Sequence, residues 1–153
     1  MTERRSVAIH EAGHAVASFF HLRRVRYVTV KPNGLVLGHV AYPRPRANWE
    51  PTTGIALSHM ESALAGYWAQ REFGYRPFLA QWEGDRETAA DYALSIAAEG
   101  EADLWLRIAG MRAQRLVRVR RTEIEIVADR LMEVDTIDMA ELRRLILSRV
   151  TTI

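Results

Sequence analysis

The chain has 153 residues, of which 48% are hydrophobic and 26% are charged, with a formal net charge of +2 and a pI near 9.3. This length suits a single domain, residues 1–153, with a buried core. The absence of cysteine excludes disulfides and thiolate metal ligands. No segment approaches the roughly 18 apolar residues of a membrane span. The N-terminus lacks the hydrophobic stretch of a secretory signal, so we expect a cytoplasmic protein.

The first predicted element is a helix from about Glu3 to His21, which contains no proline. Two short strands follow, within residues 25–30 and 35–42. The Asn33-Gly34 pair between them favours a tight turn, so we expect a β-hairpin. The only lysine, Lys31, precedes a proline, which excludes a GxxxxGK[ST] phosphate-binding loop.

After a proline-containing loop, the rest of the chain has a helical pattern. Pro77 and the neighbouring glycines indicate an irregular segment, and Asp85 is expected to open the helix that follows it. Asp138 and Glu141 have the spacing of a capping box. The sequence therefore predicts a mainly α (α+β) domain with one small β-hairpin, and helices over residues 53–73, 86–98, 101–134 (one long helix or two shorter ones) and 138–148.

The motif HExxH lies inside the first predicted helix, at residues 10–14. Positions i and i+4 share one face of a helix, so His10 and His14 can direct two imidazole nitrogens at one ion. Glu11 projects about 100° around the helix from His10. It can therefore activate a water held by the ion without ligating the ion itself. Zinc binds such nitrogen ligands and lowers the pKa of a bound water to about 7. We expect a Zn²⁺ cofactor, with Glu11 as the catalytic general base.

HExxH supplies two ligands, and a catalytic zinc site needs a third. A glutamate from a later helix, Glu61 or Glu72, is one source. The longer pattern HExxHxxGxxH does not fit, because Ala17 replaces its glycine and His21 lies one residue beyond its histidine. The motif alone leaves the third ligand open.

The segments IHEAGHAV (residues 9–16) and VTVKPNGLVLGHV (residues 28–40) resemble the peptidase domain of FtsH-type zinc metallopeptidases, the M41 family. Weaker similarity continues through LAGYWAQ (residues 64–70) and GDRETAADYA (residues 84–93) to the last helix. In that family an aspartate at a helix start ligates the metal. By this resemblance the metal ligands are His10, His14 and Asp85, and the protein is a zinc-dependent endopeptidase that cuts peptides or flexible, unfolded protein segments.

The resemblance also implies possible partners, and the sequence differs from the family pattern at several positions. Full-length members carry a membrane anchor and an ATPase, and neither is recognised here; self-association into a homo-oligomer or association with a separate ATPase is therefore implied. Gln70 and Arg71 replace two glutamates of the family pattern, and Trp82 suggests a narrower cleft. The alternative function is a catalytically silent zinc-containing binding or adaptor domain. A peptidase dedicated to one protein partner is a further alternative.

Arginines recur at every third position along part of the predicted helical region 101–134. Glu123, Glu125 and Asp129 come directly after them, and no aromatic residues alternate with them. This arrangement favours a solvated helix face over a nucleic-acid interface. His39, on the second strand, is either a cleft residue or a surface histidine.

Overall fold

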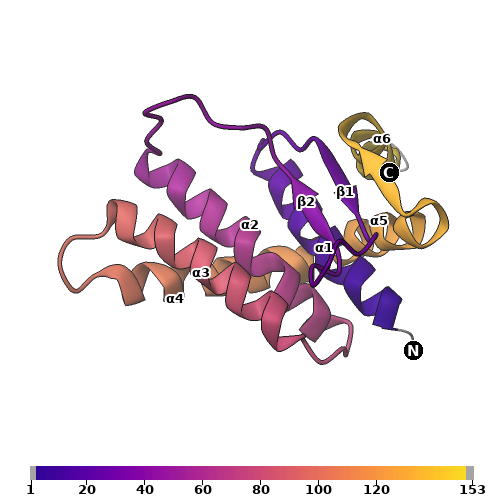
Figure 1. Cartoon of the computed structure of the whole chain (residues 1–153), viewed down its shortest axis with the longest axis horizontal. Coiled ribbons are helices and arrows are strands. Elements are labelled where there is room, and N and C mark those ends of the chain that lie inside the picture. The colour runs from indigo at the N-terminus through magenta and orange to yellow at the C-terminus, as the bar shows by residue number, and fades with distance from the viewer. Residues whose placement is uncertain (1–2, 151–153) are drawn as a thin grey trace.

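The computed structural model describes residues 3–150, without the side chains of the last two, and arranges them as a group of helices with a small sheet on one side (Figure 1). The elements are α1 (Glu3–Phe20), β1 (Tyr27–Thr29), β2 (His39–Ala41), α2 (Thr53–Glu72), α3 (Leu79–Ile96), α4 (Ala102–Val119), α5 (Arg121–Val134), β3 (Thr136–Asp138) and α6 (Met139–Val150). The mainly α (α+β) prediction is confirmed. None of the described helices combines the length and apolar character needed to cross a membrane.

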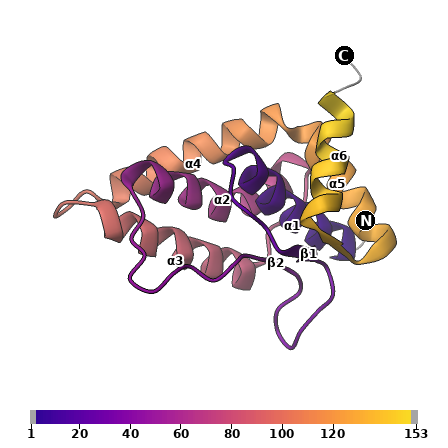
Figure 2. The same ribbon diagram turned by 90° about the horizontal axis from the view of Figure 1, so that it is seen from above.

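Helix α1 is the centre of the core. Every residue from Ser6 to Ser18 is buried, because α2, α5 and the sheet pack around this helix (Figures 1 and 2). The helix is rich in alanine, and Gly13 faces α2, where an added Cβ would lie 2.7 Å from the Cβ of Ala69. Small residues therefore allow the backbones of α1 and α2 to approach closely, and the HExxH motif lies inside this contact.

The sheet has the strand order β2-β1-β3, with both pairs antiparallel. The predicted hairpin is present, and Val28 pairs with Val40 across it. Its turn lies at the predicted position: Asn33 bridges Val36, and Gly34 has a φ of +63°. Strand β3 was not predicted. It covers one edge of β1, which leaves β2 as an edge strand within the described chain.

The helix boundaries contain one correction. Helix α3 begins at Leu79, so the expectation of an irregular segment up to Gly84 is wrong, and Asp85 lies in the second turn instead of opening the helix. The 101–134 region is two helices, α4 and α5, separated at Arg120. The capping prediction at α6 is confirmed, because the amide of Glu141 donates to Oδ1 of Asp138 at 2.9 Å.

Candidate metal centre and its cleft

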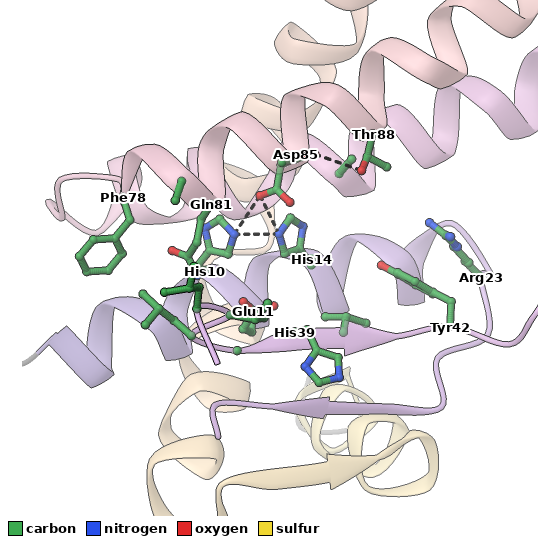
Figure 3. A pocket seen from close by; sticks show the side chains of 18 residues that line it. His10, Glu11, His14, Arg23, His39, Tyr42, Phe78, Gln81, Asp85 and Thr88 are labelled. Atoms are coloured by element: carbon green, nitrogen blue, oxygen red, sulfur yellow. Dashed lines mark hydrogen bonds and ion pairs between the residues drawn. The ribbon is translucent and has the colours of Figure 1, made fainter. Parts of the chain in front are cut away.

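Three of the residues singled out in the sequence meet at one point (Figure 3). Oδ2 of Asp85 lies 2.9 Å from Nε2 of His10 and 3.1 Å from Nε2 of His14, and the two Nε2 atoms are 2.9 Å apart. Both histidines come from α1, whereas Asp85 comes from α3. Within residues 3–150, these three form the one group of histidine and acidic side chains with the spacing of a metal site.

The other nitrogen of each imidazole faces an oxygen acceptor. Nδ1 of His10 lies 2.9 Å from Oε1 of Gln70, whose amide nitrogen donates to Oγ of Ser6 at 3.0 Å. Nδ1 of His14 lies 2.7 Å from the carbonyl oxygen of Ser62. Carbonyl oxygens only accept, so each Nδ1 carries a proton, which leaves each Nε2 as the nitrogen that can bind a metal. This arrangement is typical of metal-binding histidines.

Gly66 lets helix α2 approach the two imidazoles. A Cβ at this position would lie 2.5 Å from Nε2 of His14 and 2.8 Å from Nε2 of His10, closer than a Cβ atom can approach another heavy atom. The absence of a side chain at Gly66 is therefore required for the packing of α2 against the cluster.

Electrostatics couple the cluster. Burial alone would raise the pKa of Asp85, but the neighbouring His14 and His10 lower it well below its usual range. Burial lowers the pKa of His14, yet the charge and hydrogen bond of Asp85 and the charge of Glu11 raise it to about 9. The charged forms of His14 and Asp85 therefore stabilise each other in the metal-free chain.

Glu11 lies beside the cluster without joining it. Its side chain is buried, at 3% exposure, and lines the same cleft. Burial raises the pKa of this carboxyl group, although His10 and His14 act in the opposite direction. Gly38 covers it closely, since an added Cβ there would lie 3.1 Å from Cγ of Glu11. A buried carboxylate with a raised pKa has the properties of a general base.

The cluster opens into a cleft of about 450 Å³ between α3 and the hairpin. One wall is formed by residues 35–40, and Phe78 and Gln81 of the α3 region line the opposite side (Figure 3). His39 lines the cleft as well, and its Nε2 lies 3.1 Å from the hydroxyl of Tyr27. Of the two readings of His39, the structure therefore favours a cleft residue.

The alternative third ligands lie elsewhere. Glu61 is buried in α2, where it pairs with Nε2 of His21 at 2.5 Å and with Arg112. Glu72 pairs with Arg118 at 3.7 Å. Two of the arginines spaced by three along α4, Arg112 and Arg118, therefore form ion pairs within the fold. Trp82 does not line the cleft but packs against Tyr67, with ring centroids 4.1 Å apart, so the expected narrowing by Trp82 is absent.

Sequence reasoning missed the residues that support the cluster. The sequence showed Gln70 only as a replacement for a glutamate of the family pattern and did not indicate that it accepts from His10. The carbonyl of Ser62 belongs to the main chain and therefore has no sequence signal. Gly66 could have been found, because a glycine inside a helical pattern is destabilising unless close packing requires it.

Comparison with known proteins relates the chain to a bacterial zinc metalloprotease. No protein-family model matches the sequence. An alignment of 178 positions, at 30% identity, relates the chain to the ATP-dependent zinc metalloprotease FtsH 2 of Sphaerobacter thermophilus. It covers 94% of this chain and 27% of that protein, so the chain spans about a quarter of the length of this curated relative. The similarity supports a distant relationship to FtsH.

Proposed function

We propose that the protein is a zinc-dependent endopeptidase that hydrolyses peptide bonds in peptides and flexible protein segments. The observation that carries this proposal is the convergence of His10, His14 and Asp85 beside the buried carboxylate of Glu11, at the base of an open cleft. The distant relationship to an ATP-dependent zinc metalloprotease supports the same conclusion.

The residues present fit zinc. Two imidazole nitrogens and one carboxylate oxygen are ligands that a catalytic zinc site uses, and all three residues line the cleft. The acceptors at Gln70 and Ser62 hold both rings in the tautomer that binding requires. His10, His14 and Asp85 would hold the ion, which supplies a Lewis acid that polarises the scissile carbonyl and makes a water more acidic.

The chain itself supplies the proton transfers. Glu11 accepts a proton from the water that attacks the carbonyl, and it can return this proton to the leaving amine. Burial raises the pKa of this carboxyl group, which makes Glu11 a stronger base toward the attacking water than an exposed glutamate. A purely structural zinc site has no use for such a carboxylate, so Glu11 favours an enzyme over the silent adaptor domain.

The edge strand β2 offers the substrate a place to bind. It pairs only with β1 within the described chain, and the adjoining residues 35–40 line the cleft. The amide of Leu37 has no main-chain acceptor among residues 3–150. A peptide added as a further strand would gain main-chain hydrogen bonds with little dependence on its sequence. This mode requires an extended substrate, which is why we propose flexible segments as targets.

Metal analysis and peptide hydrolysis test the proposal together. We expect one zinc per chain, cleavage of an unstructured protein such as casein, and loss of cleavage with a chelator. Glu11→Gln keeps the size of the side chain but cannot accept the proton, so we expect near-normal zinc content and a loss of activity of about 10²- to 10⁴-fold. Zinc binding without any cleavage by the unmodified protein would instead favour the adaptor domain.

A further inference from the structure

Among the side chains that the structure describes, Arg23 supplies the only guanidinium or ammonium group that lines the cleft. Figure 3 shows it beside Tyr42, at the side of the cleft away from Phe78. Its guanidinium carbon lies 3.5 Å from the centroid of the Tyr42 ring. A guanidinium stacked on an aromatic ring keeps its N–H groups free in its own plane, where they can bind a carboxylate in bidentate fashion.

The backbone of Arg23 is fixed by the end of the helix that carries the two cluster histidines. Leu22 has a φ of +58° and is 94% exposed. Its amide donates to the carbonyl of Phe19 at 3.0 Å, and the amide of Arg23 donates to the carbonyl of Ser18 at 2.9 Å. This is a Schellman motif. A leucine in this conformation costs about 1 kcal/mol, and here it turns the chain toward the cleft.

Ser18 also holds the ring on which Arg23 lies. Its hydroxyl oxygen is 2.8 Å from the hydroxyl oxygen of Tyr42 and donates to the carbonyl of His14 at 2.8 Å. One residue of α1 therefore positions both the backbone of Arg23 and its aromatic support. The half-buried guanidinium therefore lies on a ring that Ser18 connects to His14.

This positioned cation has no acidic partner within residues 3–150. The carboxylates that line the cleft are Glu11 and Asp85, and neither forms an ion pair with Arg23. Their two negative charges would balance a zinc ion, so Arg23 would remain the uncompensated charge of the cleft. A cleft that is lined by one unbalanced cation favours a ligand that carries an anionic group.

We propose that Arg23 forms a carboxylate-binding subsite of the substrate cleft. The group it binds is a peptide carboxylate, from either an acidic side chain or the C-terminus of the substrate. This inference rests on the proposed function and adds a preference that strand pairing alone cannot supply. Arg23 would act as a specificity residue, through contact with the substrate and not with the reacting bond.

The test uses zinc-loaded full-length protein and quenched-fluorescence peptides in matched pairs. One set replaces glutamine by glutamate at each position around the scissile bond, and a second set compares a free C-terminal carboxylate with an amide. We expect one pair to show a ratio of kcat/KM of about 10 in favour of the carboxylate, the worth of a charged hydrogen bond that is partly exposed. The set that contains this pair identifies the source of the carboxylate.

Three variants connect the ratio to the subsite. Arg23→Gln should bring the ratio close to 1, and Arg23→Lys, which keeps the charge without the planar fork, should give an intermediate value. Arg24→Gln is the matched control: Arg24 is exposed, lies outside the cleft, and its loss should leave the ratio as in the unmodified protein. Equal ratios in Arg23→Gln and unmodified protein would overturn the proposal.

A binding measurement separates this inference from the proposed function. In zinc-loaded Glu11→Gln protein, the same peptides can be titrated by fluorescence anisotropy, and the ratio of Kd values should depend on Arg23 in the same way. If the unmodified protein cleaves no peptide but this ratio persists, the endopeptidase proposal fails and the subsite stands. If cleavage occurs and no pair depends on Arg23, the subsite fails alone.

Discussion

The side-chain oxygen of Gln70 lies 2.9 Å from Nδ1 of His10, on the side of the imidazole away from Asp85. This contact links α2 to the histidine motif of α1. Gln70 is fully buried and donates in turn to Ser6, so it cannot turn away without leaving polar atoms unpaired. The residue therefore determines which nitrogen of His10 is free to bind a metal.

Replacement of Gln70 by leucine should weaken zinc binding. Gln70→Leu keeps a similar volume but removes the acceptor, and we expect about a 10- to 100-fold loss of zinc affinity, the usual effect of an outer partner of a ligand. Competition with a chromophoric chelator measures it. Gln114→Leu on α4, which lies away from the cleft, is the matched control. Unchanged affinity in Gln70→Leu would mean that the His10 ring is oriented by other contacts.

Asp85 should be indispensable for the metal. Asp85→Ala removes one of three ligands, so the loss of zinc affinity should exceed the 10- to 100-fold effect of an outer partner. Asp91→Ala, an exposed aspartate six residues further along α3, and Glu72→Ala should both retain the metal. Measurement of bound zinc after dialysis distinguishes the variants. Zinc retained at full stoichiometry by Asp85→Ala would move the third ligand elsewhere.

Gly66 should tolerate no side chain. In Gly66→Ala the new Cβ meets both imidazoles, and we expect a destabilisation of about 1–3 kcal/mol, as for other overpacked cores, together with weaker zinc binding. Gly110→Ala is the control, because Gly110 lies inside α4 with no atom within 4 Å of its Cβ position. That change should stabilise the protein by about 1 kcal/mol through helix propensity. Urea denaturation measures both.

The metal-free protein should lose stability as the pH rises. The pKa of His14 is raised from 6.5 to about 9 in the folded chain, so its protonated form stabilises the fold fully below pH 6.5. This contribution is lost as the pH rises through about 9. Zinc binding must displace the same proton, so zinc affinity should increase across this range while the metal-free Tm falls. His14→Gln should remove the pH dependence of the metal-free Tm. If the pH dependence persists in this variant, another titrating group causes it.

Much of the fold follows from local signals in the sequence. The first helix, the hairpin with its turn at Gly34, and the capped last helix are set by hydrophobic period, turn residues and the Asp138 cap. The start of α3 was missed because Gly84 was interpreted as the end of an irregular segment. In the structure Gly84 lies within the helix and nothing contacts its Cβ position. Its cost in helix propensity is outweighed by the packing of α3.

Strand β3 could not be predicted, because three residues between two helices are too few to show an alternating pattern. The approach of Asp85 to the histidines depends on how α3 packs across α1, which local sequence does not determine; only the family resemblance indicated it. Arg23 and Tyr42 carry no motif, and their stacking arises from the turn at Leu22. Local physics therefore predicts the elements, whereas the surroundings of the cluster come from tertiary packing.

The pairing of β1 with β3 determines when, during synthesis, the frame around the HExxH helix can be completed. Thr29 and Thr136 lie 107 residues apart along the chain, and their hydroxyl oxygens are 2.7 Å apart in the sheet. While the ribosome is still adding the last third of the chain, α1 lacks its cover from α5, and β1 has an open edge that β3 will later occupy. A nascent chain thus carries the HExxH motif without a rigid frame around it. The proposed endopeptidase activity, if it needs this frame, can begin only after β3 has been synthesised, because β3 closes the open edge of β1.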